Sequence, residues 1–420
     1  MKVRELNYSY LMKNAFAANI MSLGVVQIVN YIIPLITLPF LIRILGIENY
    51  GKMTLAIVLS IYIQMIIDYG FDLSAAREIS KRKKRKHSIN KIYTNTIFCK
   101  MALAGAIFPI VILTAYTPMY QDMKEMILIL FAFQVTKVFF PQWLYQGLEQ
   151  MSYIAKLEIA NKLIYLIGII LFVKNETDLN NVAWAMLSGS LTASVLSSVI
   201  VHDRLKVYYV KPSIKLMLWN AKKGYDIFKS KAYSILYRNS NVVILGLTAE
   251  PVLVGYYAVA EKIIKIIQSL QEVVGKVLFV RMASYGKQGK NHIVNIINQY
   301  NSKLNIIYIV LICVLILSSY WIVFFLLGDQ SIETVILLLI MSFVIFFGGK
   351  SYFIGMVVLL PTGNEKKFKD NILKTGLFSV VICILLTLKY LHYGAAASLL
   401  IAEIYLYLLM NKSMKDVIRC

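Results

Sequence analysis

Residues 64–77 read QMIIDYGFDLSAAR, and residues 268–281 read QSLQEVVGKVLFVR. The two stretches lie 204 positions apart and share a glutamine, an acidic residue and an arginine in register. The equivalent pairs are Gln64 with Gln268, Asp68 with Glu272, Arg77 with Arg281 and, upstream, Gly51 with Gly255 and Ala56 with Ala260. Because polar residues inside apolar helices are costly in a membrane, their recurrence in register indicates an internal duplication.

The composition is that of a membrane protein. The chain has 420 residues, of which 59% are hydrophobic and only 16% charged, and this excludes a conventional soluble domain. Apolar stretches close to the ~20 residues that span a bilayer recur along the whole chain. The predicted spans are 18–42, 53–76, 92–115, 124–147, 152–173, 180–202, 225–248, 253–280, 301–327, 333–360, 370–390 and 393–411. The sequence therefore predicts an all-α polytopic membrane protein with about twelve transmembrane helices.

The formal net charge of +22 follows alternate loops and forms no single basic surface. Lysines and arginines gather after the second, sixth, eighth and tenth spans, most densely at 81–86, whereas the loops between carry Glu250 and Asp329. By the positive-inside rule, both termini and the basic loops are cytoplasmic. This distribution predicts a topology signal, so we expect no nucleic-acid partner.

The longest polar connection, near 203–223, divides the chain into two sets of six spans. We predict an N-terminal six-helix bundle over 1–205, a basic cytoplasmic linker over 206–223 and a C-terminal six-helix bundle over 224–420. Because six is an even number, the two bundles enter the membrane in the same orientation and are parallel repeats. The loops leave no room for a catalytic domain, so the function resides among the helices and we expect no enzyme.

Polar side chains follow one face of the predicted eighth span. Glu261, Lys265, Gln268 and Glu272 are spaced by four, three and four residues, which places them along one side of a helix. A charge at the membrane centre costs about 2.5–3.5 kcal/mol even on a mild scale, so this face cannot meet lipid. It either lines a water-filled cavity or forms ion pairs within the protein.

Cationic and amide side chains in several spans predict an anion-binding cavity. The candidate substrate-binding residues are Asn30, Lys137, Lys231, Arg238, Asn241, Lys262, Lys265, Gln268 and Lys350. Guanidinium and ammonium groups withdrawn from water are natural phosphate partners, so we expect an anionic substrate. The candidate ion-coupling residues are Asp68, Glu261 and Glu272, which would carry H⁺ or Na⁺ or serve equally as counter-ions of the lysines. Asp72 shares the polar face of the second span, and Lys100 stands alone in the apolar third span.

The four cysteines and four histidines are scattered, without the spacing of a metal site or a redox pair, so we expect neither a metal nor a cofactor. The chain also contains no glycine-rich phosphate-binding loop followed by lysine and serine or threonine. It therefore does not resemble an ATP-driven pump. If the chain moves its substrate across the membrane, we expect the energy to come from an ion gradient or from the distribution of the substrate itself.

Six short motifs carry a resemblance to a known family. They are IPLITLP at 33–39, LGIENYG at 45–51, DYGF at 68–71, AARE at 75–78, PQWLYQGLE at 141–149 and VGYY at 254–257. With them, nearly the whole chain resembles the Wzx-type O-antigen and capsular polysaccharide flippases of the multidrug, oligosaccharidyl-lipid and polysaccharide exporter superfamily.

The resemblance implies a substrate, a mechanism and a location. The substrate would be an undecaprenyl-diphosphate-linked oligosaccharide, turned by alternating access from the cytoplasmic to the periplasmic leaflet of the bacterial inner membrane. Coupling to an ion gradient and a complex with a polysaccharide polymerase are further expectations. The alternatives are a drug or solute exporter or a cell-wall lipid-precursor flippase of the same superfamily, and a membrane polysaccharide polymerase or ligase. The short external loops disfavour the last of these.

Overall fold

The computed structural model describes residues 2–83, 85–285, 290–328 and 331–419. Over these ranges the chain is helical and contains no β-strand, which confirms the predicted all-α class. The helices are α1 (Lys2–Asp68), α2 (Phe71–Lys81), α3 (Lys86–Ala115), η1 (Pro118–Met123), α4 (Lys124–Val138), α5 (Gln142–Gly147), α6 (Met151–Phe172), η2 (Glu176–Asp178), α7 (Leu179–Val199), η3 (Ile200–Arg204), α8 (Ile214–Thr248), α9 (Pro251–Tyr285), α10 (Lys290–Leu327), α11 (Ile332–Tyr352), η4 (Phe353–Leu359) and α12 (Glu365–Arg419).

All twelve predicted spans lie on helices. Two of the helices each contain two spans, because their backbone is broken inside: α1 at Gly46, with a φ of 76°, and α12 at Leu391, with a φ of 49°. Among the described residues, seven helical segments are long and apolar enough to cross a membrane, and these seven include both broken ones. The other three predicted spans correspond to α6, α8 and α9, which carry several charged side chains each.

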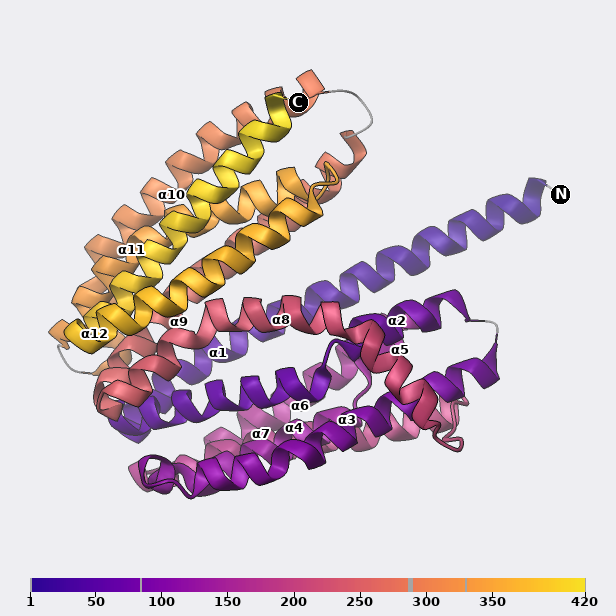
Figure 1. The fold of residues 1–420 in the computed structure, drawn as a ribbon, viewed down its shortest axis with the longest axis horizontal. Helices are drawn as coiled ribbons and strands as arrows, with labels where there is room; N and C mark the ends of the chain where they lie inside the picture. The colour runs from indigo at the N-terminus through magenta and orange to yellow at the C-terminus, as the bar shows by residue number, and fades with distance from the viewer. Residues whose placement is uncertain (1, 84, 286–289, 329–330, 420) are drawn as a thin grey trace. The chain divides into compact units, whose positions relative to one another are not determined.

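The first compact unit comprises residues up to Leu38 and Leu59–Lys231. In it α6 packs against α7, α7 against α4, and α4 against α3, while α2 lies beside α5 (Figure 1). The short helix α5 supplies Trp143 and Tyr145, which are among the largest fully buried side chains of the chain. The Tyr145 hydroxyl donates to the backbone oxygen of Ser197 on α7 at 3.2 Å. The aromatic residues of the PQWLYQGLE motif therefore form part of the packed interior of the first unit.

The second compact unit comprises Pro39–Val58 and the residues from Ala232 onward. Here α11 packs against α9, α10 and α12 (Figure 1). Its core is built from side chains of α9, α10, η4 and α12, including Met282, Tyr308, Phe353, Val358 and Met410. This grouping differs from the predicted boundaries at 205 and 224, because part of α1 belongs with the second unit. The predicted division into two six-helix bundles stays a prediction.

The predicted linker over 206–223 is docked on the first unit. Its backbone NH groups bond to side chains of α3: Val210 donates to Thr94 Oγ1 at 3.0 Å, and Ser213 donates to Asn95 Oδ1 at 2.8 Å. Directly after these bonds the chain enters α8, so the last ten linker residues are helical. Polar side chains of α3 thus accept hydrogen bonds from backbone NH groups of this segment and supply the partners that these groups need.

Two glycines that the sequence repeat makes equivalent meet in a reciprocal contact inside the second unit. A Cβ atom on Gly51 would collide with the backbone oxygen of Pro251, and one on Gly255 would collide with the backbone oxygen of Ile47. Ile47 and Pro251 are themselves separated by the repeat distance of 204 residues. Such an exchange of partners is what a two-fold relation between equivalent segments produces. The contact supports the internal duplication.

Candidate functional site

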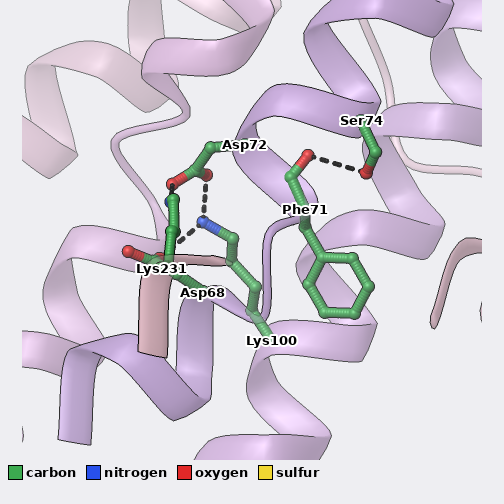
Figure 2. A network of polar contacts seen from close by, with 6 residues as sticks. All are labelled: Asp68, Phe71, Asp72, Ser74, Lys100 and Lys231. Atoms are coloured by element: carbon green, nitrogen blue, oxygen red, sulfur yellow. Dashed lines mark hydrogen bonds and ion pairs between the residues drawn. The ribbon is translucent and has the colours of Figure 1, made fainter. Parts of the chain in front are cut away.

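Four charged side chains form a cluster in the first unit, which we call the break cluster: Asp68, Asp72, Lys100 and Lys231 (Figure 2). The ammonium group of Lys100 lies 2.9 Å from Asp68 Oδ1 and 2.5 Å from Asp72 Oδ1. The second oxygen of Asp72 faces Lys231 at 3.8 Å. Two carboxylates and two ammonium groups make the cluster neutral as a whole, which lowers the cost of placing it within apolar helices.

A backbone break positions these four residues. Helix α1 ends at Asp68, and Tyr69 and Gly70 adopt positive φ angles of 39° and 73° before α2 begins. A side chain at Gly70 would come within 2.8 Å of the backbone oxygen of Gly224 on α8, so the break and α8 are in close contact. The Tyr69 ring stacks on Phe228 of α8, with the ring centres 4.6 Å apart. The DYGF motif therefore carries a break in the helix between two acidic residues.

A second polar chain runs between α8, α9 and α12 in the second unit. Buried Asn241 donates to the hydroxyl of Tyr257 at 3.1 Å and to the backbone oxygen of Ala395 at 3.2 Å. The Tyr257 hydroxyl donates to Glu261 at 3.4 Å, and Lys265 pairs with the same carboxylate at 2.8 Å. One of the predicted i,i+4 ion pairs of the charged face is thus formed.

A third polar group surrounds Glu403, a buried residue of α12. Arg238 and Tyr237 of α8 act electrostatically on its carboxylate. The Tyr237 hydroxyl is buried and forms no hydrogen bond of ordinary geometry with any described residue. A side chain at Gly348 of α11 would come within 2.7 Å of Gln268 and 3.2 Å of Glu403. The absence of a side chain at Gly348 therefore lets α9 and α12 bring these two polar groups together.

The other predicted residues lie at the edges of these groups or apart from them. Lys137, near the end of α4, has its ammonium within electrostatic reach of Asp68. Lys350 is buried near the end of α11, and its ammonium lies 5.9 Å from the centre of the Phe346 ring. Three more residues are partly buried on α1 and α9: Asn30, Lys262 and Glu272.

The candidate residues are thus distributed over both units. Asn30, Asp68, Lys137 and Lys231 belong to the first unit, and the other eight belong to the second. That both sets line one central cavity stays a prediction, as do the roles assigned to them.

Five residues of the polar groups were not assigned to the site from the sequence: Asp72, Lys100, Tyr237, Tyr257 and Glu403. Three of them carried a signal, because a charge inside or at the end of an apolar span is rare and seldom without a role. Tyr237 and Tyr257 carried no such signal, since tyrosine is common in this chain, with 28 copies.

Comparison with known proteins shows which family the chain is similar to. A family model described as "Polysaccharide biosynthesis protein" matches residues 16–285. A protein of Escherichia coli (strain K12) described as "Putative O-antigen transporter" is 27% identical over 394 residues, which cover 93% of this chain and 94% of that protein. A protein of Shigella dysenteriae with the same description is 26% identical and covers 94% of this chain.

Two solved structures of similar fold are a lipid II flippase and a multidrug resistance transporter. The lipid II flippase MurJ in an inward closed conformation superimposes with a TM-score of 0.71 at 15% identity, covering 95% of this chain and 87% of that chain. A multidrug resistance MATE family transporter of the MOP superfamily in an inward-facing conformation gives a TM-score of 0.69 at 12% identity, covering 92% and 98%. At such identities the likeness concerns the fold alone.

Proposed function

We propose that this chain, which belongs to the polysaccharide biosynthesis protein family, is a flippase for a lipid-linked oligosaccharide. The resemblance drawn from its sequence motifs is confirmed by the family match over 16–285. The substrate that we propose is an undecaprenyl-diphosphate-linked repeat unit of an O-antigen or capsule. It moves from the cytoplasmic to the periplasmic leaflet of the bacterial inner membrane.

The observation that carries the proposal is that α8, which contributes residues to both units, presents accessible cations in each of them. In the first unit Lys231 reaches only a long contact with Asp72, and its side chain is 38% exposed. In the second unit Arg238 is exposed on α8. A diphosphate offers several charged oxygens to such groups, and charge-assisted bonds to phosphate are among the stronger polar contacts in proteins. The polar groups thus suit a substrate with an anionic linkage between lipid and sugar.

The mechanism that we propose is alternating access between the two halves. Moving an oligosaccharide through hydrocarbon would leave its hydroxyls without hydrogen bonds, at a cost of several kcal/mol for each unpaired group. Partly buried amide groups such as that of Gln268 replace water along this route. The lipid tail stays in the bilayer, and no covalent bond is made or broken. The chain acts as a transporter and not as an enzyme.

Reconstituted transport tests this function. In proteoliposomes that hold undecaprenyl-diphosphate-linked oligosaccharide, we expect the protein to expose the sugar to an added glycosidase faster than in protein-free vesicles. Drugs of the kind exported by MATE transporters and lipid II serve as competing substrates. Transport of these compounds without movement of the lipid-linked oligosaccharide would establish one of the two alternatives and contradict our proposal.

The same vesicles test coupling to H⁺ or Na⁺. Glu272→Gln keeps the shape of the side chain but removes its charge, so we expect transport to lose its stimulation by an imposed ion gradient. Asp68→Asn should have a smaller effect on coupling, because Asp68 is held by Lys100 as a counter-ion. If both variants keep the full gradient response, these two carboxylates do not carry the coupling ion.

We also propose that both termini and the basic loops face the cytoplasm. A cysteine placed at Lys366 should then be protected from an impermeant thiol reagent in intact cells, whereas one placed at Glu250 should react. Permeabilised cells provide the control, since both positions should react there. Labelling of position 366 together with protection of position 250 would mean that the orientation is reversed. A complex with a polysaccharide polymerase is a further proposal, which co-purification from the native membrane would test.

A further inference from the structure

The two lysines of the break cluster differ sharply in their surroundings. The side chain of Lys100 is 5% exposed and contacts both carboxylates at hydrogen-bonding distance. The side chain of Lys231 is 38% exposed and approaches Asp72 only to 3.8 Å. Figure 2 shows Lys100 between the two aspartates and Lys231 beside Asp72. The ammonium group of Lys100 is therefore buried and bound by two carboxylates, whereas that of Lys231 is accessible and weakly paired.

Lys100 joins the two sides of the backbone break. Asp68 is the last residue of α1 and Asp72 the second residue of α2, and Lys100 of α3 binds both across the helix break at Tyr69 and Gly70. Removing this buried cation would leave two carboxylates close together, with only the more distant Lys231 as a counter-ion. Lys100 is therefore a positioning residue, which holds Asp72 in place.

Asp72 uses its two oxygens for different partners. Oδ1 is bound by Lys100 at 2.5 Å, while Oδ2 faces Lys231 at 3.8 Å. The side chain of Asp72 is 34% exposed, so the contact with Lys231 is reached by solvent and screened by it. If Lys231 moves away, Asp72 keeps its counter-ion on Oδ1. When Lys231 is released, Lys100 still contacts both carboxylates, although the cluster then carries one net negative charge.

We propose that Asp72 is a built-in competitor of the substrate. It occupies the ammonium group of Lys231 while the site is empty and yields it to the diphosphate of an arriving lipid. This inference rests on the proposed function, because it takes a polyprenyl diphosphate as the occupant.

The physical basis is a difference in charge and in the number of acceptor oxygens. The diphosphate that joins lipid and sugar carries about −2 charges in total, one on each phosphate, against −1 for a carboxylate, and it offers more acceptor oxygens. A diphosphate therefore outcompetes Asp72 for Lys231, whereas a neutral lipid does not. Ligands without an anionic linkage meet a lysine that is already neutralised. Asp72 thereby makes the site selective for strongly anionic headgroups.

The first arm of the test needs no substrate. The purified protein in nanodiscs is treated with an amine-acylating reagent, and the rate of modification at Lys231 is followed by mass spectrometry. Releasing an exposed ion pair should raise this rate about two- to fivefold in Asp72→Asn. Asp72→Glu keeps the negative charge and should react like the natural protein. Asp226→Asn is the matched control. Asp226 is exposed on α8, the helix that carries Lys231, and this variant should leave the rate of modification at Lys231 unchanged.

The second arm adds a polyprenyl diphosphate without sugar, and the corresponding neutral polyprenol. The diphosphate should protect Lys231 from acylation, and Asp72→Asn should need about two- to fivefold less of it for half protection. The polyprenol should give no protection. An unchanged acylation rate in Asp72→Asn, or equal half-protection concentrations, would overturn the inference.

Its failure can be told apart from failure of the proposed function. If the natural protein flips the lipid-linked oligosaccharide while the diphosphate leaves Lys231 unprotected, the inference is wrong and the function stands. If it neither flips that substrate nor is protected, both are wrong. Thermal unfolding of each variant in nanodiscs establishes that the compared proteins are folded.

Discussion

Replacing Gly51 or Gly255 with alanine should strongly reduce the amount of folded protein. In each case the new methyl group would meet the backbone of the facing helix, which cannot turn away as a side chain can. Overpacking typically costs 1–3 kcal/mol, and we expect about 3 kcal/mol for each variant because two backbones must separate. The stabilities of the variants and the natural protein are compared by the midpoint of thermal unfolding, measured by size-exclusion chromatography of heated detergent-solubilised protein.

Gly105→Ala is the matched control, since Gly105 also lies in a helix but no atom would come within 4 Å of its new methyl group. Alanine is favoured over glycine inside a helix, so this variant should be neutral or slightly more stable. The double variant Gly51→Ala/Gly255→Ala should cost less than the sum of the single ones, because one shift of the helices relieves both collisions. If Gly51→Ala is as stable as Gly105→Ala, the reciprocal contact does not exist as described.

The second large effect is expected at Arg238. A hydrogen bond to a charged group contributes about 1.5–3 kcal/mol, so Arg238→Ala should lower transport of the lipid-linked oligosaccharide about ten- to a hundredfold. Arg238→Lys should keep part of the activity, because the charge remains while the planar fork is lost. Transport in proteoliposomes is compared at equal protein content, and abundance in the membrane is measured separately.

The buried carboxylate of Glu403 offers a way to separate a role of Arg238 in transport from a role in stability. Arg238 is the cation that acts on Glu403, so its removal alone also leaves a buried charge less well compensated. The double variant Arg238→Ala/Glu403→Gln removes both charges and should restore abundance without restoring transport. Recovery of transport in the double variant would mean that Arg238 serves only to neutralise Glu403.

Much of the fold follows from the sequence, and the candidate site follows only in part. The Glu261 and Lys265 pair could be predicted, because residues four apart on a helix always face the same side. The pairs of Lys100 with Asp68 and Asp72 could not, because they join α3 to two helices that meet at a break. The reciprocal glycines were visible as a repeat, but their contact was not.

What the sequence alone determined is the class of protein, the positions of its spans, the repeat and the family. These properties depend on local quantities: the apolar length needed to cross a bilayer, the cost of each buried charge and the order of residues in short motifs. Only the tertiary structure decided which charges neutralise one another, that Lys100 is enclosed while Lys231 is accessible, and that Arg238 acts electrostatically on Glu403. The reason is physical. An ion pair within apolar helices depends on distances of a few ångströms between side chains of separate helices, and those distances are set by how whole helices break and pack.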